Sequence, residues 1–314
     1  MREKWNYLML STFLGLSMLN TYGQGCSDAG FCTMGAMRPG QPYSNNIKIV
    51  LKSVEMSQYV GVTRFDDRIY ATTLDFNVGI SNKDAAQFKL PYMAAEGPLG
   101  QSSGLGDLSV SYTRILIKEI EYQLNITGGA KIALGNSDKT FEDKSLPMYY
   151  QQSLGTNDLV LGLSFLTNKW LVATGLQYSL NSNENGFFWG PWIKEGVDKE
   201  MIEQYPSSIE LDRGKDVMLR VERSLKKSNW GLNLGLLGIY RLNEDIRTDP
   251  KAKERVSVKG SDGLALTAIL GIKYNFNVKS GVKLIYGQRL IKRDFNPDGL
   301  SREQVVEIGY VYQF

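Results

Sequence analysis

Apolar and polar residues alternate through most of this chain. In the segment 229–242, Trp230, Leu232 and Leu234 fall on one face, whereas Asn233 and Arg241 fall on the other. A β-strand with one apolar and one polar face produces this period of two. The pattern predicts about twelve strands, which cover residues 47–59, 67–81, 84–93, 104–117, 119–135, 157–166, 169–180, 215–225, 229–242, 262–276, 280–291 and 304–314.

The connections between these strands alternate in length. The tight connections lie at 82–83, 118, 167–168, 226–228 and 277–279. The longer ones lie at 60–66, 94–103, 136–156, 181–214, 243–261 and 292–303. A membrane barrel with both ends in the periplasm has short periplasmic turns and longer external loops. We therefore predict an all-β fold, a transmembrane antiparallel up-and-down β-barrel of about twelve strands, with roughly ten to fourteen compatible with the pattern.

The two ends of the sequence favour export to a membrane. Segment 1–23 has a basic start, an apolar run and a small-residue exit, which are typical of a secretory signal peptide. In segment 304–314, Tyr310, Tyr312 and Phe314 share the apolar face. This ending resembles the last strand of bacterial outer-membrane barrels, where a terminal aromatic residue is part of the assembly signal. We expect a place in the outer membrane of a Gram-negative bacterium, with its lipid and the barrel assembly machinery as partners.

Both cysteines lie between the predicted signal peptide and the first predicted strand. We divide the chain into a signal peptide at 1–23, a periplasmic N-terminal segment at 24–46 and the barrel at 47–314. Cys26 and Cys32 lie just after the predicted cleavage point. In an oxidising periplasm, such a pair is expected to form a disulfide. Acylation of Cys26 is the alternative, because a cysteine close to a cleavage site can also carry lipid.

Composition removes several classes of protein. Hydrophobic residues make up 42% of the 314 residues, yet the best later apolar run, 231–240, is about half a helical membrane span. With 36 basic and 33 acidic residues, the net charge of +3 gives no basic footprint for nucleic acid. The sequence contains no histidine, which removes the catalytic triads and metal sites that depend on it. We expect no enzyme activity and no cofactor.

A set of charged residues on the predicted strands falls on the polar faces. The strand pattern assigns to these faces Lys131, Arg220, Glu222, Lys273, Lys283 and Arg289. A charge directed at the middle of a bilayer would cost roughly 2–4 kcal/mol for Arg or Lys. A polar lumen lining is therefore the interpretation that a barrel requires, and a solvated sheet face is the alternative.

The longest predicted external loop contains a cluster of aromatic residues. Phe187, Phe188, Trp189 and Trp192 follow one another closely. Long loops commonly need internal packing, so this loop is expected to fold on itself and cover the barrel mouth. The alternative is a surface at which an apolar solute enters.

Three segments resemble a known group of barrels. Gly104-Leu105-Gly106-Asp107-Leu108, segment 129–135 and segment 151–163 are similar to the MetA-like phenol-degradation transporters, relatives of the long-chain fatty-acid channels. That group usually has proline where Ala133 stands, and its N-terminal plug is longer than segment 24–46. The resemblance implies passive uptake of small hydrophobic or aromatic solutes. We predict a monomeric channel of this kind; the alternative is a structural or partner-binding barrel that transports nothing.

Overall fold

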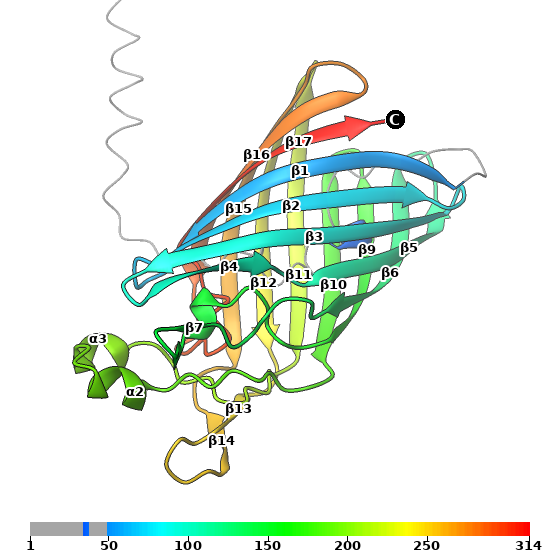
Figure 1. The fold of residues 1–314 in the computed structure, drawn as a ribbon. Coiled ribbons are helices and arrows are strands. Elements are labelled where there is room, and N and C mark those ends of the chain that lie inside the picture. Colours follow the sequence, from blue (N-terminus) through cyan, green and yellow to red (C-terminus); the bar gives the residue numbers. More distant parts are fainter. Residues whose placement is uncertain (1–33, 38–48) are drawn as a thin grey trace, which may run out of the picture.

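The computed structural model describes residues 34–37 and 49–314, and these form a closed antiparallel barrel. Figure 1 shows the strands as a ring with most non-barrel elements gathered at one end. The twelve barrel strands are β1 (Val50–Val62), β2 (Arg68–Gly79), β3 (Asp84–Gly97), β5 (Leu108–Lys118), β6 (Tyr122–Ile132), β9 (Asp158–Thr167), β10 (Trp170–Ser179), β11 (Asp216–Lys227), β12 (Trp230–Arg241), β15 (Gly263–Asn275), β16 (Ser280–Ile291) and β17 (Gln304–Gln313).

The last strand closes the sheet against the first. The β1–β17 ladder runs from the pair Ser53 and Gln313 to the pair Val62 and Gln304. Each other barrel strand pairs with its neighbours in the chain, so the ring has no free edge among these twelve strands. Hydrocarbon offers no partner to a peptide N–H or C=O group, and closure is how a sheet satisfies them. The predicted fold class and strand number are confirmed.

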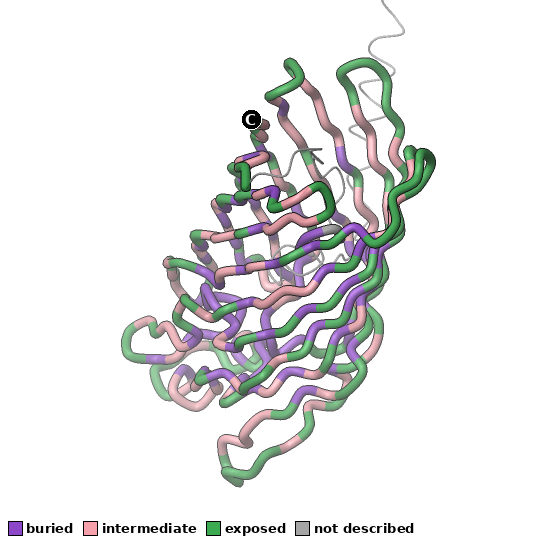
Figure 2. Tube along the Cα trace, turned by 90° about the vertical axis from the view of Figure 1, so that its right-hand side faces the viewer, coloured by how far each residue is buried: buried purple, intermediate pink, exposed green. Residues whose placement is uncertain are grey.

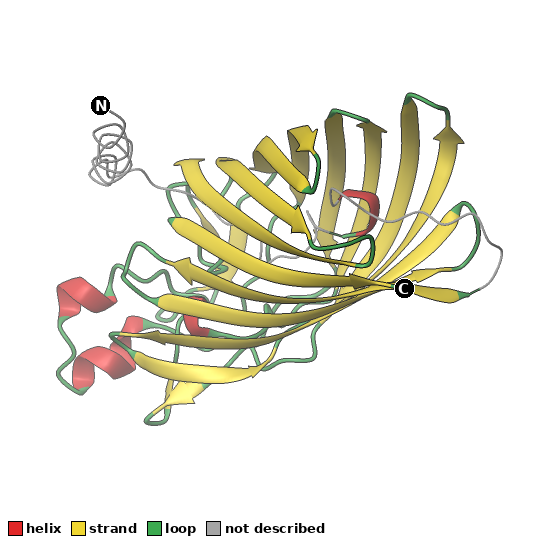
Figure 3. Cartoon of the chain, turned by 90° about the horizontal axis from the view of Figure 1, so that it is seen from above, coloured by secondary structure: helices red, strands yellow, loops and turns green. Residues whose placement is uncertain are grey.

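The strands bury one face and expose the other (Figure 2). Met56 in β1 and Leu236 in β12 are about half exposed, whereas Ser53 and Glu55 on the other face of β1 are buried. The exposed face is apolar and the enclosed face is mainly polar, which is the reverse of a soluble protein. Figure 3, seen from above, shows the sheet curving round on itself.

The short and long connections sort to opposite ends, as predicted. The periplasmic turns are 80–83, 119–121, 168–169, 228–229 and 276–279. The extracellular connections carry β7 (Thr140–Phe141), β8 (Lys144–Ser145), η3 (Met148–Tyr150), α2 (Trp189–Lys194), α3 (Lys199–Ile202), β13 (Asp245–Thr248) and β14 (Arg255–Val258). Among the residues that the structure describes, no helix has the length and apolar character needed to cross a bilayer.

One predicted external loop, 94–103, is instead a hairpin. β3 continues to Gly97, and β4 (Gly100–Leu105) returns along it. The predicted strand ended at residue 93, and Pro91, which cannot donate to a ladder, favoured a short or broken strand here. In the structure, Pro91 faces the break between β4 and β5, where its carbonyl accepts from the Gly106 N–H at 2.8 Å. The proline therefore lies at an irregular position that needs no N–H.

A short piece of the N-terminal region lies inside the barrel. η2 (Gly35–Met37) contacts β6 and β9, and the Gly35 N–H donates to Gln87 Oε1 at 2.7 Å. Figure 3 shows this short helix within the ring. The predicted signal peptide at 1–23 and the residues Cys26 and Cys32 lie outside the described residues.

A charge on the lipid-facing side should destabilise the barrel strongly. We expect Leu236→Arg, at the middle of β12, to lower the free energy of unfolding by about 2–4 kcal/mol, because the guanidinium would enter hydrocarbon. Unfolding by denaturant in liposomes measures this. Ile120→Arg is the control, since Ile120 is 98% exposed in a periplasmic turn. Equal losses in the two variants would contradict the assigned membrane face.

Candidate functional site: the barrel lumen and its mouth

Two extracellular connections fold inward and meet across the barrel mouth. Segment 146–154 lies between β8 and β9, and segment 293–302 lies between β16 and β17. The Tyr149 hydroxyl donates to the Asn296 carbonyl at 3.1 Å. Gly299 has a φ of +69°, and a Cβ there would lie 2.5 Å from the Met148 carbonyl carbon. The two backbones touch at a point where only glycine fits.

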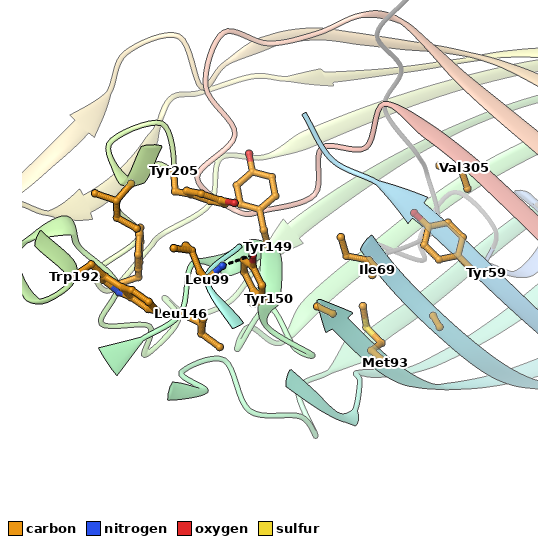
Figure 4. Packing of buried hydrophobic residues seen from close by; sticks show 14 residues of the cluster. Tyr59, Ile69, Met93, Leu99, Leu146, Tyr149, Tyr150, Trp192, Tyr205 and Val305 are labelled. Carbon is orange, nitrogen blue, oxygen red and sulfur yellow. Dashed lines mark hydrogen bonds between the residues drawn. The ribbon is translucent and has the colours of Figure 1, made fainter. Parts of the chain in front are cut away.

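A buried carboxylate joins three segments at this mouth. Asp67, which is fully buried, accepts hydrogen bonds from the hydroxyls of Thr63 at 2.9 Å, Tyr150 at 2.5 Å and Tyr205 at 2.8 Å. In turn, the Leu99 N–H donates to the Tyr150 hydroxyl at 3.2 Å, shown as the dashed line in Figure 4. Burial raises the pKa of Asp67, although the three hydroxyl donors oppose the shift.

The predicted aromatic cluster of the long loop is mostly packed. Phe187 and Trp192 are buried in the same hydrophobic cluster as Leu146 and Tyr150 (Figure 4), while Phe188 and Trp189 are only partly buried. The Trp192 indole N–H donates to the Ser145 carbonyl at 3.1 Å. This arrangement is the expected folding of the loop over the mouth. Entry of a solute at these residues stays a prediction.

A network of buried charges fixes the other side of the mouth. Arg241 donates to Asp216, Asp245 and Asp298, each at 2.8 or 2.9 Å. Arg213 lies 3.1 Å from Asp158 and 3.6 Å from Asp298, and Arg293 lies 3.9 Å from Asp298. Asp298 belongs to the inward segment 293–302, so the network attaches that segment to the barrel wall. Removing each ion from water costs several kcal/mol, so a charge in this network is stabilised only while its oppositely charged partners are present.

The carboxylates of the network differ in their protonation. Burial alone would raise the pKa of Asp298, but Arg241, Arg293 and Arg213 together lower it below the ordinary value. For Asp245 burial prevails over Arg241, and its pKa is raised. The charge of Asp298 is therefore maintained at all ordinary pH values, and this residue is the permanent anchor of the segment.

The predicted lumen residues lie on the inward faces of their strands, and most of them are paired. Lys131 Nζ lies 3.0 Å from Asp107 Oδ2. Arg220 Nε donates to Glu222 at 2.5 Å. Lys283 Nζ lies 2.7 Å from Glu307 and also contacts Glu55. Arg289 Nη2 donates to Glu303 at 2.5 Å, and Lys273 is opposite Lys283 in the β15–β16 ladder.

A cavity lies beneath the inward segments. It holds ≈ 720 Å³ of space free of protein atoms, part of which is open to solvent. Its wall comes from β1, β2, β3, β5, β6 and β17, and its roof from the two inward segments. The lining mixes apolar and polar side chains, for example Tyr59, Met93 and Leu300 beside Lys131 and Arg302.

The opposite wall of the lumen carries an apolar strip. We define the luminal apolar strip as the inward side chains Val160, Leu166, Leu171, Ala173, Met218, Leu237, Ile239 and Ile269. Met34 and Met37 of the N-terminal region pack against it and are buried. Contact with Met34 and Met37 replaces contact with water at these inward positions, which favours apolar side chains there.

Sequence reasoning missed both the charge network and the strip. The residues of the network are far apart in the chain, and nothing local distinguishes Arg241 from any other strand-end arginine. For the strip, a signal did exist. Leu171 and Ala173 fall on the face of β10 that also carries Gln177, so this strand is apolar on both faces over half its length.

Fold, faces and loop sorting together define an outer-membrane β-barrel of the Gram-negative type. No protein-family model matches the sequence, and no curated protein does. Among solved structures, the COG4313 outer membrane channel from Pseudomonas putida F1 is similar, with a TM-score of 0.60 and 13% identity over 88% of this chain and 99% of that one. The NanC porin gives 0.47 and 10%, over 84% and 100%. The KdgM porin gives 0.44 and 7%, over 83% and 99%. Sequence identities this low to solved structures indicate a similar fold and nothing further.

Closure of the mouth should depend on pH through Asp67. Because its pKa in the folded protein is raised above 3.8, its stabilising contribution is complete below that pH and is lost as pH rises through the raised value. We expect hydrogen exchange in segment 146–154, corrected for intrinsic rates, to speed up with rising pH in the wild type. Asp67→Asn should flatten this dependence, because it removes the titrating group.

The matched control is Asp66→Asn, because Asp66 is the exposed neighbour in the same turn. It should keep the wild-type pH profile. If Asp66→Asn and Asp67→Asn have the same profile, the assignment of the pH dependence to Asp67 is wrong.

Loss of Arg241 should release the inward segment 293–302. Arg241→Met leaves three carboxylates without their shared cation, and breaking such a buried pair costs about 3–5 kcal/mol. We expect segment 293–302 to be cleaved at least about tenfold faster in limited proteolysis, since roughly 1.4 kcal/mol suffices for that factor. Arg255→Met, at a half-exposed site on β14, is the control and should change little. Unchanged protection in Arg241→Met would exclude an anchoring role.

Proposed function

We propose that this protein is an outer-membrane channel for the passive uptake of small apolar or aromatic solutes. The luminal apolar strip is the observation that carries the proposal. It extends from Val160 and Met218 near the extracellular ends of their strands to Leu166 and Leu171 near the periplasmic ends. An apolar solute that moves along it stays in contact with a surface from which water is easily displaced.

Met34 and Met37 support the use of the strip as a binding surface. Methionine side chains are unbranched and adaptable, and here they cover apolar wall that would otherwise face water. A solute of similar polarity would compete with them for the same positions. We infer that the N-terminal segment and the solute alternate on the strip.

The resemblance to the MetA-like phenol-degradation and fatty-acid channel group agrees with this substrate class. The motif residues Gly104 to Leu108 form the junction between β4 and β5, where Asp107 binds Lys131 beneath the inward segments. The motif therefore belongs to the wall of the cavity that holds ≈ 720 Å³. We propose that a solute entering from outside passes this cavity before it reaches the strip.

Other parts of the proposal concern the assembled protein. We propose that the chain acts as a monomer without enzymatic activity, with Tyr310, Tyr312 and Phe314 read by the barrel assembly machinery. Tyr310 and Tyr312 lie on the exposed face of β17 near its periplasmic end, and the exposed Phe314 follows the strand. Lys131, Arg220, Glu222, Lys273, Lys283 and Arg289 would keep the rest of the lumen hydrated.

A second function has one specific observation in its favour. The mouth is closed by segments 146–154 and 293–302 and by the charge network around Arg241. A barrel that only binds a surface partner could keep such a closure permanently. Conductance in planar bilayers separates the two functions, because a permanently closed barrel passes no current.

Polar substitutions in the strip should slow apolar solutes selectively. We expect the double variant Met218→Gln/Leu237→Gln to reduce uptake of a neutral aromatic solute into proteoliposomes by about tenfold, as burial of two fewer apolar side chains costs well over 1.4 kcal/mol. Uptake of a small sugar should not fall. Ser53→Gln, at an inward site on β1 outside the strip, is the control. Equal reduction for both solutes would show that only the pore width has changed.

A further inference from the structure

The outward face of the barrel carries a group of basic residues at the periplasmic end of β10–β12. Arg223 is exposed on β11, whereas its neighbours Arg220 and Glu222 are buried. Lys227, at the end of the same strand, is opposite Trp230 in the β11–β12 ladder. The turn between β9 and β10 adds Lys169. Because residues alternate along a strand, Arg223 and Lys227 share the lipid-facing side.

These cations have aromatic neighbours on the same face. The Arg223 guanidinium lies 5.4 Å from the ring centroid of Trp170, and Arg223 pairs with Trp170 across the β10–β11 ladder. Trp230 lies 4.7 Å from Tyr274, ring centroid to ring centroid. Aromatic rings of this kind gather at the level of the lipid headgroups. The basic group is therefore at the membrane surface, where lipid phosphates lie.

No protein carboxylate neutralises the group within the described part of the chain. Neither Arg223, Lys169 nor Lys227 forms an ion pair with the residues 49–314. The adjacent carboxylate, Glu222, points into the lumen and is bound by Arg220. A cation at the level of the headgroups whose charge no protein carboxylate neutralises attracts an anion from the membrane surface.

An apolar groove begins beside Lys227. Its walls are Leu225, Leu232 and Ile272, and Trp230 and Lys227 stand at its end. Leu225 pairs with Leu232, and Leu232 pairs with Ile272, so the three side chains lie in one row across three strands. Lys227 lies two residues beyond Leu225 on the same face of β11, so a cation adjoins this apolar row. An acyl chain against the row and a phosphate at the lysine would match the polarity of one phospholipid.

We propose that this surface is a binding site for an anionic phospholipid of the periplasmic leaflet. Arg223 and Lys227 bind the phosphate, which carries the negative charge of the headgroup, by charge-assisted hydrogen bonds. Leu225, Leu232 and Ile272 hold an acyl chain, and Trp170 and Trp230 lie on either side of the glycerol region. The site is separate from the lumen and does not depend on the proposed transport function.

Native mass spectrometry of the full chain in detergent tests the site, with phosphatidylglycerol and phosphatidylcholine of equal chain length as probes. We expect the wild type to retain phosphatidylglycerol preferentially. Arg223→Gln/Lys227→Gln should reduce this retention by about tenfold, since two charge-assisted contacts are removed. The control, Lys194→Gln/Lys251→Gln, removes the same charge from exposed extracellular positions and should behave as the wild type.

Three results would overturn the proposal: equal retention of the two lipids by the wild type, an unchanged preference in Arg223→Gln/Lys227→Gln, or an equal loss in the control. Lipid A distinguishes the leaflets, because its phosphates belong to the outer one and its retention should be the same in both double variants. Migration of unboiled and boiled samples on a detergent gel checks that each variant is folded. Conductance should be unchanged, which separates this site from transport.

Discussion

Pairing of every backbone amide in a medium without water is the constraint from which the rest of this structure follows. The ladder between β1 and β17 meets it by closing the sheet. Closure fixes which face of each strand meets lipid, and the alternation of the sequence then has only one register that keeps Leu236 outside and Glu55 inside. Most polar side chains of the strands face the lumen, so many of the luminal charges form ion pairs within a narrow space.

At the mouth, two buried carboxylates have partners of different kinds. Asp67 is held by three hydroxyl groups, whereas Asp298 is held by three arginines, and the pKa values of the two carboxyls move in opposite directions for that reason. At Asp298 the three arginines outweigh desolvation, whereas the three neutral donors at Asp67 do not. One side of the mouth is therefore sensitive to pH, while Arg241 and Asp298 keep the other side fixed. An opening that begins at Tyr150 would leave the segment 293–302 attached.

Much of the barrel could be predicted from the sequence because each strand has one face in lipid and one in the lumen, and this difference appears as alternation among neighbouring residues. Alternation located every barrel strand within a few residues, and the alternating length of the connections sorted them correctly to the two ends of the barrel. The hairpin of β3 and β4 was missed, since Pro91 argues against a ladder unless the break opposite it is known. The contact between Tyr149 and Asn296 joins residues that are 147 positions apart, and no local pattern encodes such a pair.

The luminal apolar strip departs from the alternation of apolar and polar residues from which the barrel strands were predicted. A barrel strand should be apolar outside and polar inside, and Leu171 and Leu237 depart from it on the inside. Departures from a strong pattern are expected where function requires them, because stability alone would favour polar groups in a hydrated lumen. The arginine network maintains the shape of the pore and the strip gives it an apolar surface. Our proposal of an apolar solute therefore rests on the strip rather than on any charged residue, and packing against Met34 and Met37 is the structural alternative.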